Sequence, residues 1–305
     1  MTKQLIIVSG PTAVGKTDVA IWLADQFGTE IINADSRQIY REMVIGTAVP
    51  SAKQQARIKH HFIGHRSVRD YYNASLFETE ALDILTRLFA RNDVVIMAGG
   101  SGMYIDAVCR GIDDIPAVEA GVRNRIHEEF TVAGLEGLRE KLQQCDPEYY
   151  ARVDLKNPQR IRKALEVFEM TGRPYSSFLT GEIKPRSFSF IKIGLDLPRG
   201  ELHDRINRRV DTMMKQGLLQ EARGLYPNRR MNALNTVGYK ELFSFLDNQC
   251  TLDDAVDKIK GHTRQYARRQ LTWFRKDKDI QWFSPDEPAA ILNYIYKKLN
   301  KNGTA

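Results

Sequence analysis

Residues 5–27 read LIIVSGPTAVGKTDVAIWLADQF, and this stretch decides the fold. Residues 5–9 form an apolar run typical of a buried strand, and residues 10–17 match a phosphate-binding loop that ends in Lys-Thr. The apolar residues that follow recur at helical spacing: Val19, Ala20, Leu23, Ala24 and Phe27. A strand, a glycine turn and a helix in this order predict a phosphate site at the end of a parallel strand.

Each residue type in this loop suits a polyphosphate ligand. Gly10 and Gly15 let the backbone bend so that its N–H groups point at phosphate oxygens, and the helix N-terminus adds its positive end. Lys16 supplies a mobile charge, and the Thr17 hydroxyl can bind a Mg²⁺ ion that bridges two phosphates. The pattern predicts a diphosphate or nucleotide site and leaves ATP and other polyphosphates open. Its residues are Gly10, Pro11, Thr12, Ala13, Val14, Gly15, Lys16 and Thr17.

The composition of the 305 residues is that of a globular protein, with 42% hydrophobic and 27% charged residues. No apolar run approaches membrane-spanning length, and residues 1–3 lead into the first strand without a signal-peptide pattern. We therefore expect a cytoplasmic protein with no membrane partner, and a monomer.

The cysteines Cys109, Cys145 and Cys250 are far apart, which predicts buried thiols and neither a disulfide framework nor a zinc site.

The net charge of +7 is concentrated near the C-terminus. Residues 258–278 hold eight basic residues against one acid, Asp277, and Tyr266, Trp273 and Phe274 lie among them. Basic side chains beside stacking rings favour a structured nucleic acid, in which phosphates give affinity and unstacked bases meet aromatic rings. The alternative is a solvated helix face whose aromatic side chains turn to the core. The sequence leaves both interpretations open.

Alternating strand and helix patterns predict an α/β fold, a doubly wound parallel sheet. The predicted strands cover residues 5–9, 30–34, 93–98 and 190–197, with helices between them over 16–27 and 74–90. The gap after residue 98 is too long for one crossover, so we predict a helical insertion over residues 116–186. The P-loop core then comprises residues 1–115 and 187–305. Further helices are predicted over 122–130, 135–144, 148–152, 158–171, 200–215, 218–225, 239–247 and 252–273.

Three further sites could take part in chemistry. Asp35 ends the second strand, where ligands of parallel sheets bind, so it is a candidate general base; a helix-capping or loop acid is the alternative. Arg205 and Arg209 share a helix face and could neutralise a departing diphosphate, or form a salt-bridged surface with Asp204. The third site is the end of the third strand.

The third strand ends in Gly99-Gly100-Ser101 and carries no acid at that point. Phosphoryl-transfer enzymes with this loop usually place a Mg²⁺-binding Asp there, and Asp93 lies at the opposite end of the strand. We expect the two glycines to allow close approach of a large ligand and Ser101 to hydrogen-bond it. This pattern disfavours a nucleotide hydrolase.

As a whole, the chain closely resembles the tRNA dimethylallyltransferase family, also called tRNA isopentenyltransferases, over residues 5–283. The motifs that carry the resemblance are residues 10–17, 33–40, 46–48, 60–61, 99–104, 157–167, 171–174, 237–241 and 263–270. So long an ordered set is far more specific than the phosphate loop alone.

The resemblance implies transfer of a dimethylallyl group from dimethylallyl diphosphate to the exocyclic N6 of adenosine 37, next to the tRNA anticodon. Asp35 would accept the proton of this amino group. The leaving diphosphate would be neutralised by Lys16, by Mg²⁺ held at Thr17, by Arg209 and, second, by Arg205.

The resemblance and the basic segment together imply a set of tRNA-binding residues. They are Asp35, Ser36, Arg37, Gln38, Ser101, Arg123, Pro158, Gln159, Arg160, Ile161, Arg162, Gly238, Tyr239, Arg264, Arg268 and Arg269. The chain departs from the family at Val49, where a Lys is common, and around Asp70, which lacks the usual following Pro. No Cys/His pairs follow residue 283, so the zinc finger of eukaryotic relatives is absent and a bacterial-type enzyme is implied.

Two other functional classes share some of these features. A nucleoside or small-molecule kinase shares the phosphate loop and an acid after the second strand, but it would bind ATP and has no use for the basic segment. A non-catalytic RNA-binding module would keep its function without Asp35.

Overall fold

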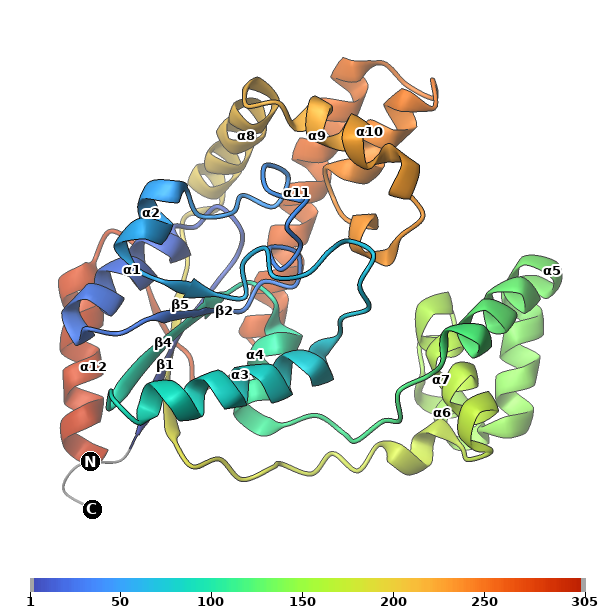
Figure 1. Cartoon of the computed structure of the whole chain (residues 1–305), viewed down its shortest axis with the longest axis horizontal. Helices are drawn as coiled ribbons and strands as arrows, with labels where there is room; N and C mark the ends of the chain where they lie inside the picture. Colours follow the sequence, from blue (N-terminus) through green and yellow to red (C-terminus); the bar gives the residue numbers. More distant parts are fainter. Residues whose placement is uncertain (1–2, 303–305) are drawn as a thin grey trace. The chain divides into compact units, whose positions relative to one another are not determined.

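The computed structural model describes residues 3–302, and a sheet of six parallel strands lies at its centre (Figure 1). The strand order is β3-β2-β4-β1-β5-β6. The bounds are β1 Gln4–Ser9, β2 Ile31–Asn33, β3 His60–His61, β4 Val94–Gly99, β5 Ser189–Leu195 and β6 Gln281–Phe283. The four predicted strands are therefore present, and the α/β fold class predicted from the sequence is confirmed.

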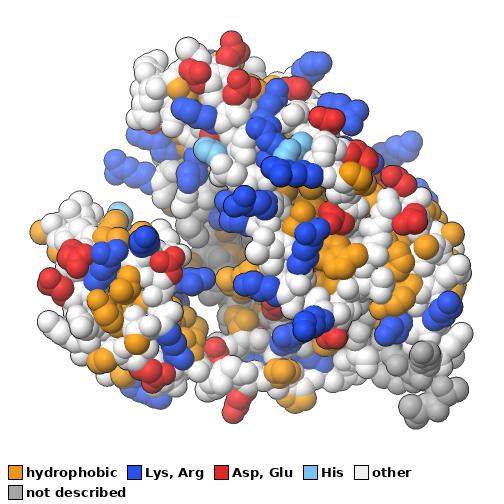
Figure 2. Space-filling model, turned by 180° about the vertical axis from the view of Figure 1, so that it is seen from behind, with side chains coloured by type: hydrophobic (Ala, Val, Ile, Leu, Met, Phe, Trp, Pro, Cys, Tyr) orange, Lys and Arg blue, Asp and Glu red, His pale blue; other side chains and the backbone are white. Residues whose placement is uncertain are grey.

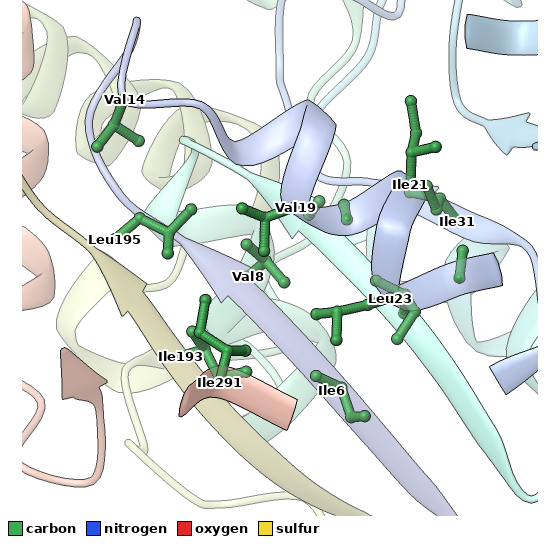
Figure 3. Close-up of a cluster of buried hydrophobic side chains, with 14 of the residues drawn as sticks. Ile6, Val8, Val14, Val19, Ile21, Leu23, Ile31, Ile193, Leu195 and Ile291 are labelled. Carbon is green, nitrogen blue, oxygen red and sulfur yellow. The ribbon is translucent and has the colours of Figure 1, made fainter. Parts of the chain in front are cut away.

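The core forms around β1, which pairs with β4 on one side and β5 on the other. Ile6 and Val8 of this strand pack with Val19 and Leu23 of α1 (Lys16–Phe27), as Figure 3 shows. All four side chains are buried. A strand that is covered on both faces needs a continuous apolar sequence, which explains the run over residues 5–8.

Helices cover both faces of the sheet. Side chains alternate along a strand, so Ile6 faces α1 and Ile291 of α12, whereas Ile7 faces Ile105 of α4 across a small cavity. The other helices of the core are α2 Ala52–Arg57, α3 Ala74–Phe89, α4 Gly102–Arg110, α8 Arg199–Lys215, α9 Leu218–Leu225, α10 Tyr239–Leu246, α11 Leu252–Phe274 and α12 Pro288–Asn302.

Several elements have no counterpart among the predicted ones. The strands β3 and β6 hold two and three residues, too few for a periodic pattern, and β6 interrupts the region that the sequence predicts as helical. Helix α2 buries none of its residues, so it has no apolar stripe. Helix α4 starts at Gly102, directly after two glycines that indicate a turn.

The insertion consists of α5 (Ala120–Cys145), α6 (Pro147–Arg152) and α7 (Pro158–Thr171). Gly134 has a non-helical φ of 67° inside α5, which accounts for the two helices predicted over this span. Asn157 caps α7 by accepting hydrogen bonds from two backbone N–H groups. The buried core of this unit consists of Ile126, Leu138, Leu142, Ile161, Ala164 and Leu165.

The described chain forms two compact units. One comprises residues 3–110 and 185–302 and contains the sheet; the other comprises residues 111–184 and is helical. The sequence predicts the insertion over 116–186. Within residues 3–302, no helix combines the length and the apolar character that a bilayer crossing requires.

Candidate active site

The loop between β1 and α1 has the geometry of an anion site. Gly15, the residue before the helix, has a left-handed φ of 108°, and no side chain among the described residues caps the first turn of α1. The N–H groups of that turn are therefore free for a ligand, and the helix dipole favours a negative one. Gly10 lies against β5, where a Cβ atom would come within 2.6 Å of the carbonyl oxygen of Leu195.

Lys16 folds back over this loop. Its Nζ donates hydrogen bonds to the carbonyl oxygens of Gly10 (3.0 Å) and Pro11 (2.7 Å). Desolvation lowers the pKa of Lys16 to about 7; the negative charge of Asp35 opposes this shift and the positive charge of Arg209 adds to it. An arriving polyphosphate would restore the charged form of the ammonium group.

A cavity of about 260 Å³ opens beside the loop. It is lined by the predicted residues Thr12, Ala13, Gly15, Lys16, Thr17, Asp35, Arg37, Gln38, Arg209 and Gly238, and by further residues of the 46–50 segment, α2 and α11. Because these come from separate parts of the chain, the fold brings the phosphate loop, the candidate base and one arginine to one site.

Asp35 lies two residues after the end of β2. Its Oδ1 accepts hydrogen bonds from the backbone N–H groups of Arg37 (2.9 Å) and Gln38 (3.4 Å), which makes it a turn-forming acid. Among the described residues, none donates a hydrogen bond to Oδ2 or forms an ion pair with it. One carboxylate oxygen therefore shapes the turn and the other remains available to a ligand, so the two interpretations of Asp35 are compatible.

The arginines of α8 differ in their surroundings. Arg209 lines the cavity, its Nη1 lies 3.4 Å from the Thr12 hydroxyl, and burial lowers its pKa. Arg205 instead pairs with Glu201 at 2.8 Å, and its Nη1 reaches the carbonyl oxygen of Val14 at 3.5 Å. Arg209 thus faces the site, whereas Arg205 forms an ion pair on the helix, with Glu201 in place of the expected Asp204.

The glycines after β4 serve packing within the chain. A Cβ atom at Gly99 would lie 2.1 Å from the carbonyl oxygen of Ala34, and one at Gly100 would lie 2.2 Å from Nε2 of Gln270. Ala34 and Gln270 therefore make the close approach at these two glycines, and Gly99 also lines the active-site cavity, so the expected approach of a large ligand stays a prediction. The Ser101 hydroxyl accepts a 2.9 Å hydrogen bond from the backbone N–H of Ser36 and so joins the ends of β2 and β4.

The loop around Gly46 has an acid at its centre that no sequence pattern indicates. Glu221 of α9 accepts hydrogen bonds from the backbone N–H groups of residues 44–46. The hydroxyl of Tyr239 donates to the same carboxylate, and Tyr239 is completely buried. Its side chain therefore supports this loop, which corrects its expected role as a tRNA contact. Gly238 lines the cavity beside it.

Helix α11 presents two functional faces. Ile259, Thr263, Tyr266 and Gln270 line the active-site cavity. A second set lines a groove of about 530 Å³ with Arg199 and His203 of α8, and includes Arg264, Arg268, Leu271 and Arg275. In Figure 2, Lys and Arg side chains gather over the region of α8 and α11.

The three arginines of α11 that are predicted to bind tRNA do not all lie in this groove. Arg264 and Arg268 line the groove, whereas Arg269 lies outside it with its guanidinium 5.8 Å from the Tyr266 ring centre. Arg264 donates to Asn207, and Arg275 pairs with Asp196 at 2.7 Å. The Arg268 side chain has no hydrogen-bond or ion-pair partner within residues 3–302.

Both interpretations of the aromatic residues in this segment hold in part. Phe274 is buried in the core, as the alternative expects, and Tyr266 lines the active-site cavity. Trp273 is 42% exposed and donates a 3.0 Å hydrogen bond to Asp106. The segment is therefore partly a packing surface and partly a surface open to a ligand.

The remaining predicted tRNA residues belong to the helical unit. Pro158 begins α7, Gln159 and Arg160 are exposed, and the Arg162 guanidinium lies 6.0 Å from the Phe130 ring centre. Ile161 is completely buried in the core of this unit, which corrects its expected contact with tRNA. Arg123 donates to the carbonyl oxygen of Val118.

The cavity offers oxygen ligands for a Mg²⁺ ion. Within the described residues, no three His, Cys, Asp or Glu side chains gather closely enough to hold a metal. The Thr17 hydroxyl and the Asp35 carboxylate do line the same cavity. Mg²⁺ usually takes few protein ligands and completes its shell with phosphate and water. The residues therefore fit a Mg²⁺ that binds together with a diphosphate.

Comparisons with known proteins agree with this site. The family model described as IPP transferase matches residues 38–277. The tRNA dimethylallyltransferase 1 of Bacteroides fragilis is 50% identical over 297 residues, 97% of this chain and 99% of that protein. The tRNA dimethylallyltransferase 2 of Porphyromonas gingivalis is 50% identical over 95% of this chain and 97% of its own length. The phosphate loop at residues 10–17 lies outside the family-model match.

Solved structures show the same likeness. The full-length tRNA isopentenylpyrophosphate transferase of Bacillus halodurans has a TM-score of 0.72 and 34% identity, covering 99% of this chain and 98% of its own. A eukaryotic dimethylallyltransferase described as acting on tRNA has a TM-score of 0.73 and 25% identity, over 93% and 74% of the two chains. With its fold and half of its residues shared over almost the full length, the chain belongs to the tRNA dimethylallyltransferase family.

Proposed function

We propose that this protein transfers the dimethylallyl group of dimethylallyl diphosphate to the exocyclic N6 of adenosine 37 in tRNA. The observation that carries this assignment is the single cavity in which the phosphate loop, Arg209 and the free oxygen of Asp35 meet. A diphosphate leaving group needs its negative charge neutralised, and a weakly nucleophilic amine needs a group that accepts its proton.

The donor's diphosphate binds at the start of α1. The free N–H groups of the first turn, the Lys16 ammonium and the Arg209 guanidinium face its oxygens. As the bond between the prenyl C1 and the diphosphate oxygen breaks, its electron pair leaves with the diphosphate. Fixed donors that meet this growing negative charge stabilise the transition state more than the ground state.

Asp35 takes the proton of the amine. When the adenine N6 forms its bond to the prenyl C1, the nitrogen becomes positively charged and must lose a proton. The Oδ2 atom of Asp35 accepts it, while Oδ1 remains in the turn with Arg37. The Mg²⁺ ion would be held by the Thr17 hydroxyl and the diphosphate oxygens, and it supplies further charge neutralisation.

Both units offer surfaces to the tRNA. We assign phosphate contacts to the groove arginines Arg264 and Arg268, to Arg269, and to Arg123, Gln159, Arg160 and Arg162 of the helical unit. Ser36, Arg37, Gln38 and Ser101 lie where the acceptor adenosine would enter, at the carboxyl ends of β2 and β4. We place this monomeric enzyme in the cytoplasm, where tRNA is modified.

The kinase alternative is less consistent with the site. Phosphoryl transfer needs an acid at the end of the strand beside the phosphate loop. The residues directly at the carboxyl end of β4, Gly99-Gly100-Ser101, include no Asp or Glu, and Asp93, just before the strand, pairs with Lys3 at 2.7 Å at the opposite end.

Incubation with prenyl-labelled dimethylallyl diphosphate, Mg²⁺ and unmodified tRNA tests the assignment. We expect label in the tRNA, dependent on Mg²⁺ and abolished when adenosine 37 is replaced by guanosine. The Asp35→Ala variant serves as the inactive control. Transfer of the γ-phosphate of ATP to a small molecule, without prenyl transfer, would support the kinase instead.

A further inference from the structure

One buried amide joins the phosphate loop to α11. Gln270 is 6% exposed, and its Oε1 accepts a 2.8 Å hydrogen bond from the backbone N–H of Thr12. Its Nε2 donates a 2.9 Å hydrogen bond to the carbonyl oxygen of Gly100. A single side chain therefore connects the start of the phosphate loop, the turn after β4 and α11.

Both ends of this amide matter, because an unpaired polar group in a buried position is costly. A glutamate of the same length could accept from Thr12, but its ionised form could not donate to Gly100. A leucine would leave both backbone groups without a partner. The site thus requires a donor and an acceptor on one side chain.

The turn after β4 is shaped to receive the amide. A Cβ atom at Gly100 would lie 2.2 Å from Gln270 Nε2, a distance that no packing allows. Three residues further along α11, the Trp273 ring covers Gly102 in the same manner. Close packing between this turn and α11 leaves the helix little freedom to slide or rotate relative to β4.

Thr12 connects Gln270 to the active-site cavity. Its hydroxyl lies 3.4 Å from Nη1 of Arg209, the arginine that faces the diphosphate site. Thr12 and Gln270 both line the cavity, together with Tyr266 one turn earlier in α11. The position of the loop that binds the donor is therefore tied to the helix that also presents the groove arginines.

We propose that Gln270 is a positioning residue for the prenyl donor, which holds the phosphate loop in the conformation that binds diphosphate. The proposal rests on the proposed function for the identity of the donor, but its direct readout is diphosphate binding in the absence of tRNA. The proposed mechanism gives Gln270 no other role, and the two hydrogen bonds of its amide both go to backbone groups.

The test compares Gln270→Leu and Gln270→Glu with Gln249→Leu, an exposed glutamine just before α11. We expect Gln270→Leu to weaken inorganic diphosphate binding and to raise KM for dimethylallyl diphosphate, each by roughly tenfold, as loss of buried hydrogen bonds implies. The Kd for tRNA should change by less than about twofold, and Gln249→Leu should behave as the wild type.

The Gln270→Glu variant separates positioning from general stability. A protonated glutamic acid can donate to Gly100 and accept from Thr12, whereas the carboxylate cannot donate. Diphosphate binding by this variant, relative to the wild type, should therefore recover as the pH is lowered. If folded Gln270→Leu and Gln270→Glu bind diphosphate as the wild type does at every pH, Gln270 is only a packing residue.

The outcome is independent of the proposed reaction. If the wild type failed to modify tRNA but the variants lost diphosphate binding, Gln270 would still position the loop and the proposed function would fall. If the wild type transfers the prenyl group and the variants keep normal diphosphate affinity and KM, the inference fails and the proposed function stands.

Discussion

The hydroxyl of Tyr239 donates a 2.6 Å hydrogen bond to the carboxylate of Glu221, and both side chains hold the loop around Gly46. A Cβ atom at Gly46 would lie 2.6 Å from the Tyr239 ring, so the loop backbone rests directly on it. Tyr239, which the sequence predicts as a tRNA contact, therefore supports the loop that forms one wall of the cavity.

Removing the Tyr239 hydroxyl should therefore lower the stability of the fold more than the affinity for tRNA. We expect Tyr239→Phe to lower the free energy of unfolding by about 1 kcal/mol, measured by urea denaturation. The Kd for tRNA should stay within about twofold of the wild type. A large loss of tRNA affinity at unchanged stability would return Tyr239 to the RNA interface.

Two substitutions at Asp35 separate its turn from its chemistry. Asn keeps an oxygen that can accept the N–H groups of Arg37 and Gln38, whereas Ala loses the turn as well. If Asp35 accepts the proton, both variants should lose about 10²-fold or more in kcat while diphosphate binding is retained. Single-turnover assays with saturating tRNA measure this. Near-normal turnover of Asp35→Asn would exclude the carboxylate as the base.

The low pKa of Lys16 predicts a pH dependence of diphosphate binding. In the free protein this pKa is about 7, and a bound anion favours the ammonium form, so binding takes up a proton. As the pH rises above the free-state pKa, affinity should fall by up to about tenfold per pH unit. Below that value this group should contribute no further change.

Calorimetric titrations across this range provide the measurement, with Lys16→Arg as the control. Arginine stays charged, so its profile should contain only the titration of the diphosphate itself. The difference between the two profiles then reports Lys16. Parallel profiles would show that Lys16 is already fully charged in the free protein.

The groove on α11 predicts salt-dependent binding of tRNA. Neutralising Arg264 and Arg268 together should reduce the slope of log K against log salt by roughly 0.7 to 0.9 for each tRNA phosphate that these arginines neutralise. Lys297→Gln with Lys298→Gln, two exposed residues of α12, removes the same charge elsewhere. Equal slopes for both double variants would mean that the groove does not bind tRNA specifically.

The corrected position of Ile161 gives a prediction for the helical unit. Because Ile161 is buried among Ile126 and Leu165, Ile161→Ala should cost about 2 to 5 kcal/mol of stability. Its exposed neighbour in α7, Arg160, should show the reverse pattern: Arg160→Ala should weaken tRNA binding without lowering the melting temperature. Melting curves and tRNA titrations of the two variants distinguish the roles.

The sequence predicts elements well where the local pattern and the fold agree. Helix α1 has its predicted bounds, because a glycine starts it, Gly28 ends it in a left-handed conformation, and apolar spacing fills it. The phosphate loop and Asp35 can be predicted for the same reason: each closely follows a buried strand. Ile161, by contrast, lies inside a family motif, and only its helical phase shows that it points inward.

Residues that support the site, such as Gln270 and Glu221, cannot be predicted from the sequence, because their hydrogen-bond partners are distant in the chain. Gln270 bonds to a residue 258 positions away, and Glu221 to a loop 177 positions away. Neither side chain has a local pattern that identifies its partner. The Gly99-Gly100 pair carries a signal of close approach, but the approaching atoms belong to Ala34 and to Gln270 of α11, and the sequence does not identify them.

The sheet ends on both sides in very short strands, β3 with two residues and β6 with three. A long edge strand exposes a row of unpaired N–H and C=O groups that can recruit a strand from another molecule. Edges this short offer no more than a few such groups. A folded open sheet of this kind therefore offers little edge for strand addition, without being closed into a barrel.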